Sequence, residues 1–137
     1  MRHVFQTAIV LAFVGTLGCQ AKLSVSKTFK LPDEGSNGKI FLMPIQPGAQ
    51  TITVTVTVKS GSNVDAFVVP ASLIPDDVFG KSVNEKKTWE EKGYGFKRDM
   101  KTGTATAKVP ANVDYKVIII LSDDAREKSE IDVKITN

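Results

Sequence analysis

The sequence contains few of the residues that hydrolases and metal sites depend on: one cysteine, one histidine and one tryptophan among 137 residues. The histidine is His3 and the cysteine is Cys19, so the chain beyond Cys19 has no histidine and no thiol. These absences exclude a Ser-His-Asp or Cys-His catalytic arrangement there, an internal disulfide, and a zinc site built on His and Cys. No glycine-rich phosphate-binding motif occurs either. Catalysis by carboxylates or by a Ser-Lys pair remains possible by composition, but no sequence feature indicates a cleft. We therefore predict no catalytic residue, no cofactor and no metal site.

The charge is too balanced to favour nucleic acid as a partner. Lys and Arg number 18 and Asp and Glu 15, which gives a formal net charge of +3. Arg2 is the only charged residue in 1–18, so removing that segment leaves an almost neutral chain. With 42% hydrophobic and 24% charged residues, the composition is that of an ordinary globular domain. We predict one domain over residues 23–137 and no binding of nucleic acid.

The N-terminal residues have the pattern of an export signal. Arg2 gives a positive start, and 4–17 is mostly apolar. This apolar stretch has the length of a signal-peptide core and is shorter than the ~20 residues of a membrane span. Residues 1–18 are therefore predicted to be a signal peptide, and 19–22 a short tether.

The end of this signal, Thr16-Leu17-Gly18-Cys19, resembles the lipobox of bacterial lipoproteins. The resemblance implies a diacylglycerol on the Cys19 sulfur, cleavage before that residue and a membrane anchor, with Gln20 favouring the outer membrane. Thr16 stands where the family usually has Leu, and Leu17 where a small residue is common. Two alternatives stay open: ordinary cleavage after Ala21, which would release a secreted protein, and a retained anchor.

Beyond the tether the pattern predicts one β-strand after another. The clearest signal is 51–58, where four Thr alternate strictly with Ile and Val, as expected of a strand with one buried face. We interpret the Thr side as an ordinary solvent-exposed face. The fold class predicted is an all-β antiparallel β-sandwich, jelly-roll-like, of about seven or eight strands with a short helical insertion. The predicted strands are 23–31, 39–45, 50–59, 64–70, 104–109, 115–121 and 131–135.

The insertion covers 71–101 and is long for a plain connection. Pro75-Asp76-Asp77 is typical of a helix start, and Asn84 to Lys92 followed by Gly93 predicts a second helical turn. The strand 115–121 carries five consecutive large apolar residues, which suggests burial on both faces. Something must then cover its outer face. The available residues are Leu73, Ile74, Val78, Phe79 and Trp89.

Three aromatic residues of the insertion, Trp89, Tyr94 and Phe96, are the candidate ligand or partner contacts. Aromatic rings stack on sugars and anchor protein interfaces. The alternative is that Trp89 and Phe96 pack on the sheet and Tyr94 has no special role. The acidic pairs 76–77 and 123–124 could offer oxygens to calcium, but turns and helix starts explain both.

From Gly48 onward the pattern resembles the bacterial pre-peptidase C-terminal-type β-sandwich domains. The residues that carry this resemblance are 48–56, 64–69, 105–110, 115–118 and 133–135. The resemblance implies an accessory module of an exported protein. Some members bind calcium, but no ligand motif matches here. The sequence therefore predicts a non-catalytic, exported envelope protein, structural or binding another envelope protein. The alternative is a carbohydrate-binding module that uses Trp89 and Tyr94.

Overall fold

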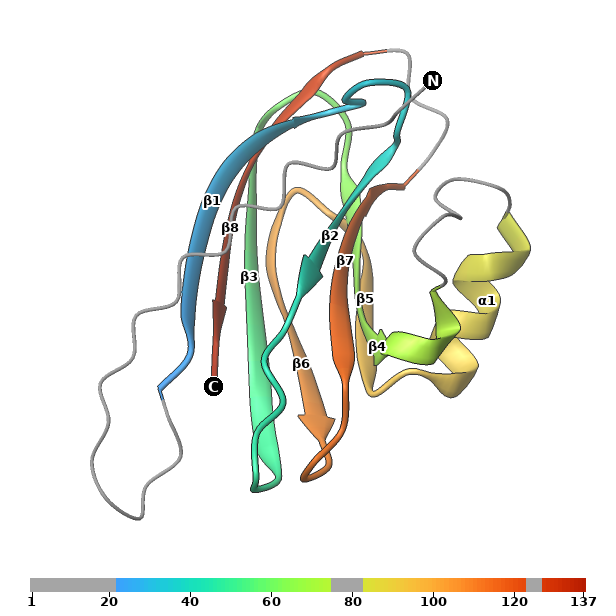
Figure 1. The fold of residues 1–137 in the computed structure, drawn as a ribbon. Coiled ribbons are helices and arrows are strands. Elements are labelled where there is room, and N and C mark those ends of the chain that lie inside the picture. Colours follow the sequence, from blue (N-terminus) through green and yellow to red (C-terminus); the bar gives the residue numbers. More distant parts are fainter. Residues whose placement is uncertain (1–21, 75–82, 123–126) are drawn as a thin grey trace.

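The computed structural model describes residues 22–74, 83–122 and 127–137, and these ranges form eight strands, one α-helix and one 3-10 turn (Figure 1). The strands are β1 (Ser24–Leu31), β2 (Gly38–Leu42), β3 (Gln50–Ser60), β4 (Val64–Pro70), β5 (Gly95–Met100), β6 (Thr102–Val109), β7 (Tyr115–Leu121) and β8 (Ser129–Thr136). The 3-10 turn η1 (Ala71–Leu73) and the helix α1 (Val83–Lys92) lie between β4 and β5. The predicted signal peptide, Cys19 and the acidic pairs 76–77 and 123–124 lie outside the described residues.

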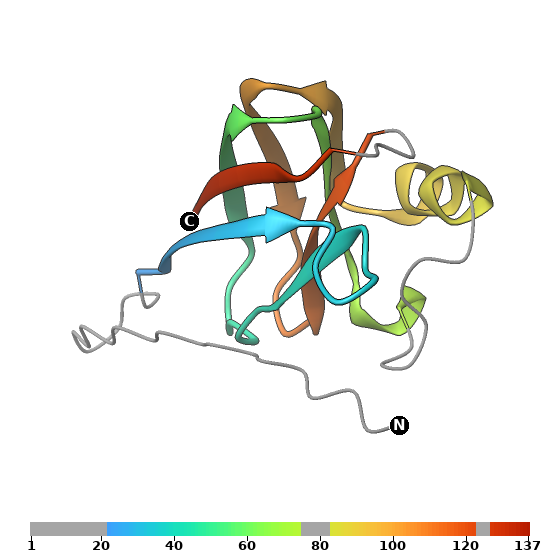
Figure 2. The ribbon, with the colours of Figure 1, turned by 90° about the horizontal axis from the view of Figure 1, so that it is seen from above.

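The strands form two four-stranded antiparallel sheets that pack face to face (Figures 1 and 2). One has the order β1-β8-β3-β6 and the other β2-β7-β4-β5. Every connection between consecutive strands crosses from one sheet to the other, except β4 to β5, which are neighbours in one sheet. This is the connectivity of an eight-stranded jelly roll. The predicted all-β sandwich is confirmed.

The chain passes directly from one sheet to the other along one side of the sandwich, at the corner between β5 and β6. The sheets meet where β5 turns into β6, and the Val58 N–H donates to the Lys101 carbonyl at 2.6 Å beside that corner. On the opposite side β1 and β2 are edge strands of different sheets. The rings of Phe29 and Phe41 meet across this side, 5.9 Å apart. At the other end of β1, the Leu23 N–H donates to Asn137 Oδ1 at 2.7 Å, which fastens the start of β1 beside the end of β8.

The alternation in β3 produces the core as predicted. Ile52, Val54 and Val56 are fully buried between the sheets, and the Thr residues between them point outward. The turn Ser60-Gly61-Ser62-Asn63 then reverses the chain into β4, and Gly61 has a φ of 90°, which only glycine adopts without strain. Burial of β-branched side chains along both sheets supplies most of the stabilisation.

The two central strands of the sheet β2-β7-β4-β5, β7 and β4, are buried on both faces. The outer face of this sheet carries a second apolar cluster, in which Phe67, Val69, Ile118 and Ile120 are covered by Ile74 and Trp89, with Ile40 and Leu73 at the margin. The predicted cover over β7 is confirmed for Leu73, Ile74 and Trp89. Val78 and Phe79 lie outside the described residues. Figure 2 shows α1 lying against the outside of this sheet.

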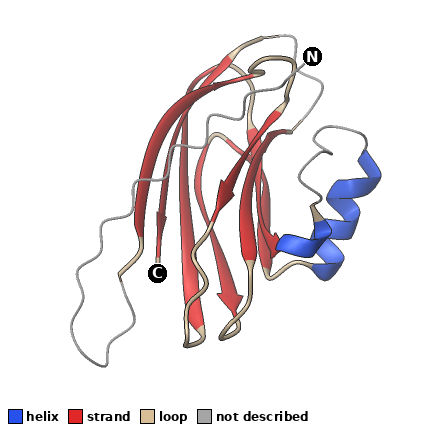
Figure 3. Cartoon of the chain, viewed as in Figure 1, coloured by secondary structure: helices blue, strands red, loops and turns tan. Residues whose placement is uncertain are grey.

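The predicted helix at 84–92 is confirmed as α1 (Figure 3), but the strand that follows it was not predicted. Residues 95–100 form β5, which pairs with β4. Strand β5 is an edge strand, and its central side chains are charged and exposed. The sequence of this segment therefore lacks the apolar alternation by which a strand is recognised. Asp99 also has a φ of 55°, and the register shifts near it. Within the described residues, no helix is long and apolar enough to cross a membrane.

Candidate functional site

The three aromatic residues singled out in the sequence do not form one platform. Trp89 is only 5% exposed and meets Phe67 edge-on, with ring centroids 5.3 Å apart. Phe96 is 44% exposed and stacks on Phe67, its partner across β4 and β5, with ring centroids 6.1 Å apart. Tyr94 is half-buried and packs against the core between the sheets. The structure therefore brings Trp89 and Phe96 to one apolar cluster and leaves Phe96 as the exposed ring.

The most concentrated polar cluster lies beneath α1 and centres on Asp65. This side chain sits on β4 and is 1% exposed. Lys86 of α1 donates to Oδ2 at 2.7 Å, and Arg98 of β5 lies 3.4 Å from the same oxygen. Oδ1 accepts from the Asp99 N–H at 2.8 Å and from the Ser122 hydroxyl at 2.7 Å. Helix α1, strand β5 and the residue after β7 thus converge on one buried carboxylate of β4.

This cluster fastens α1 to the sheet. Burial raises the pKa of the Asp65 carboxyl, but the hydrogen bonds from Lys86, Asp99 and Ser122 outweigh it and hold the pKa below 3.8. Lys86 also donates to the carbonyls of Leu121 and Ser122, at 2.8 and 3.1 Å. A carboxylate whose pKa is lowered and whose oxygens already accept hydrogen bonds is a poor proton acceptor. Sequence analysis missed this cluster, although an aspartate inside the apolar run 64–69 was its signal.

The open surface of the molecule is the outer face of β1-β8-β3-β6, which we call the hydroxyl face. It consists of the alternate residues of 24–30, 51–59, 102–108 and 130–136. Most of them are Ser or Thr. The strand register sets them side by side in rows, for example Ser26, Lys134, Thr55 and Thr104. The second sheet has no such face because α1 and η1 lie on it.

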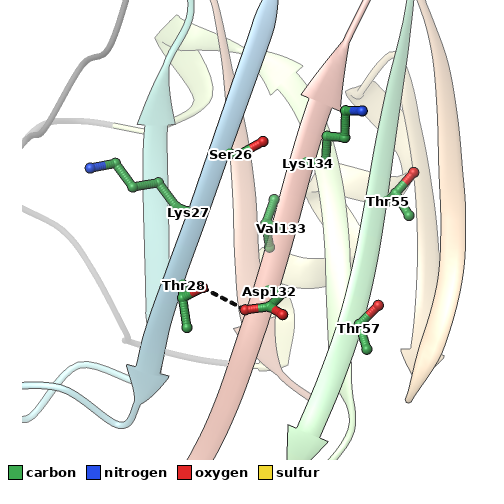
Figure 4. Close-up of a pocket in the computed structure, with 8 residues that line it drawn as sticks. All are labelled: Ser26, Lys27, Thr28, Thr55, Thr57, Asp132, Val133 and Lys134. Atoms are coloured by element: carbon green, nitrogen blue, oxygen red, sulfur yellow. Dashed lines mark hydrogen bonds between the residues drawn. The ribbon is translucent and has the colours of Figure 1, made fainter.

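A shallow hollow of about 340 Å³ lies on the hydroxyl face between β1, β8 and β3 (Figure 4). Ser26, Thr28, Thr55, Thr57 and Lys134 contribute to its lining. The hollow offers hydroxyls as donors and acceptors together with the exposed ammonium group of Lys134. It is wide and open, which suits contact with a polar surface better than enclosure of a small molecule.

The acidic side chains of this face are already paired. Lys59 lies 3.6 Å from Glu130 and 3.3 Å from Asp132, and the Thr28 hydroxyl donates to Asp132. The Thr28 hydrogen bond and the neighbouring Lys59 hold the pKa of the Asp132 carboxyl below its usual value. Pairs this exposed contribute little to stability. Within the described ranges, no group of three or more His, Cys, Asp or Glu side chains could hold a metal ion.

Comparison with known proteins gives no family for this chain. No protein-family model matches it. No curated protein matches its sequence. A solved structure from Aeromonas hydrophila, PliG, described as a periplasmic lysozyme inhibitor of g-type lysozyme, is similar to 90% of this chain over 91% of its own length, with 13% identity and a TM-score of 0.47. At this identity and TM-score the likeness assigns neither family nor activity.

Proposed function

We propose that the chain is a non-catalytic, exported binding module of the cell envelope that contacts a partner protein through its hydroxyl face. The observation that carries this proposal is that one outer face of the sandwich is covered by α1, whereas the other is left uncovered by the described chain. Helix α1 is fastened over one sheet by the Asp65–Lys86 pair and the Trp89 contact, while the other sheet presents polar rows with no element over them in the described chain.

The chemistry of the hydroxyl face supports a protein partner over a carbohydrate. Sugar rings are held by exposed aromatic faces, and the described hydroxyl face consists of Ser, Thr, Lys, Asp and Glu. Trp89, on which the carbohydrate alternative depends, is buried between α1 and the sheet. A flat surface of threonines and lysines instead offers many hydrogen-bond donors to carbonyls and carboxylates on another protein, with little side-chain entropy to lose at Thr.

Binding is tested by placing a photo-crosslinking residue at Thr55, in the centre of the hydroxyl face, and a matched one at Glu91, which is exposed on α1. In intact cells we expect one discrete crosslinked protein from position 55 and none from position 91. The Thr55 product should weaken when Lys134→Glu is added beside it, since the strand register sets Thr55 opposite Lys134. Equal crosslinking from both positions would count against the hydroxyl face.

We further propose that the module is held at the membrane by a lipid on Cys19. The lipobox-like residues 16–19 and the apolar stretch 4–17 support this proposal. It is tested by the intact mass of the mature protein from a detergent-extracted membrane fraction. A chain that starts at Cys19 and carries added acyl mass is the expected result. An unmodified chain that starts at Lys22 would mean ordinary secretion, and would leave the binding proposal to be tested on a freely diffusing protein.

A further inference from the structure

A lysine interrupts the apolar row on the inner side of β1. The inward-facing residues of this segment are Leu23, Val25, Lys27, Phe29 and Leu31. Four of them belong to the core between the sheets or pack against it. Lys27 has the same orientation, is half-buried, and pairs with the core residue Val133. An apolar side chain at this position would continue the core, so a charged one requires a reason.

The reason lies in the position of β1 at the edge of its sheet. All eight residues of β1 pair with β8. No strand of the described chain pairs with the other side of β1, so within that part of the chain the backbone N–H and C=O groups on this side have no strand partner. An edge of this length is a template for another strand. Strand β2, the nearest edge of the other sheet, pairs only with β7.

The inward row of β1 is also self-complementary. If a second copy of β1 ran antiparallel along the free edge with its two-fold axis at Lys27, Val25 would face Phe29 of that copy. Leu23 would likewise face Leu31 of that copy. Every inward position of this register then matches apolar with apolar, apart from the centre, where the two Lys27 residues meet.

We propose that the free edge of β1 is a latent pairing surface for a second copy of this chain, and that Lys27 keeps two copies apart. Directly opposite residues of antiparallel strands have Cβ atoms about 4.5–5.5 Å apart, so the pairing would force two ammonium groups together. Figure 4 shows the Lys27 side chain running away from β8, past the free side of β1. A second copy would occupy that space and remove both charges from water, which is costly.

The test compares Lys27→Val with Lys30→Val by analytical ultracentrifugation. Lys30 is on the same strand but belongs to the exposed row, so its variant changes charge and composition equally. We expect wild type and Lys30→Val to be monomeric at the concentrations used. Lys27→Val should form a dimer whose dissociation constant is about 100-fold or more below the limit set by either of them, because a like-charge contact is removed. The amides of β1 should then exchange more slowly with deuterium, because their free edge becomes hydrogen-bonded.

A second measurement keeps the proposal testable if Lys27→Val does not fold. Lys27→Glu alone should be monomeric, because two carboxylates repel as two ammonium groups do. A mixture of Lys27→Glu with wild type should form a one-to-one dimer that weakens as salt is added. The proposal is overturned if wild type is itself a β1-paired dimer, if folded Lys27→Val stays monomeric, if Lys30→Val dimerises equally, or if the mixture does not associate. None of these outcomes depends on the hydroxyl face or on a partner protein.

Discussion

Asp65→Asn lowers the free energy of unfolding by about 3–5 kcal/mol, the range expected when one partner of a buried ion pair loses its charge. The amide keeps the size of the carboxylate, but it leaves the Lys86 ammonium without the anion 2.7 Å away. Lys86 is held in place by α1 and by two backbone carbonyls, so it cannot simply turn to solvent. Urea denaturation followed by far-UV circular dichroism measures the loss.

Lys59→Met is the matched control for this result. It removes a lysine from carboxylates of similar geometry, at 3.3 and 3.6 Å, but its side chain is about half exposed. We expect a change within about 1 kcal/mol. If Asp65→Asn cost no more than this control, the carboxylate would not be the anchor of the helix.

The same variant has a characteristic pH dependence. The pKa of Asp65 is lowered in the folded protein, so its charge stabilises the fold above the unfolded value of 3.8, and this contribution is lost as the pH falls through the lower folded pKa. The gap in stability between wild type and Asp65→Asn should therefore stay constant between about pH 5 and 8 and narrow as the pH falls below about 4. A gap that widened toward acid would contradict the assignment.

Trp89→Ala is expected to cost about 3–5 kcal/mol of unfolding free energy, the usual range for emptying a buried aromatic position. Its ring is almost fully buried against Phe67, and it is the largest side chain that α1 contributes to the second cluster. Its loss leaves a cavity and also weakens the hold of α1 on the sheet. Relative to wild type, amide hydrogen exchange in Trp89→Ala should therefore accelerate more in α1 than in β3.

Phe96→Ala provides the comparison, because Phe96 stacks on the same Phe67 but is 44% exposed. Its loss should cost roughly 1 kcal/mol. Equal costs for the two variants would mean that Trp89 is not buried in solution, which would revive the carbohydrate alternative.

The sandwich could be predicted from the sequence because a strand with one buried face and a strand with two buried faces each leave a recognisable pattern of residues. In β3 the alternation of Thr with Ile and Val states which side is inside, and in β7 the unbroken apolar run states that both sides are. From that run it followed that residues of the insertion must cover the sheet, and the structure confirms this for Leu73, Ile74 and Trp89 among the available residues. Periodicity is informative when the environment on the two sides of a strand differs or is extreme.

The parts that could not be predicted depend on contacts between distant residues. Strand β5 carries no apolar alternation because most of its side chains are exposed, although it pairs with β4 and turns into β6 at the corner of the sandwich. The anchor at Asp65 joins Lys86, Asp99 and Ser122, which are far apart in sequence and share no motif. The hydroxyl face was visible only as one row of threonines on one strand. Its extent follows from the register that aligns β1, β8, β3 and β6.

The fastening of Leu23 to Asn137 has a mechanical consequence if the chain is tethered to a membrane ahead of β1. A pull on the tether then enters the domain at the first residue of an eight-residue ladder to β8. A pull along β1 loads all of those hydrogen bonds in parallel, whereas a pull across β1 would open them one after another from the Leu23 end. The domain should therefore resist a pull along β1 far better than a pull across it. The orientation of the domain relative to its tether would then decide how much tension it withstands before it unfolds.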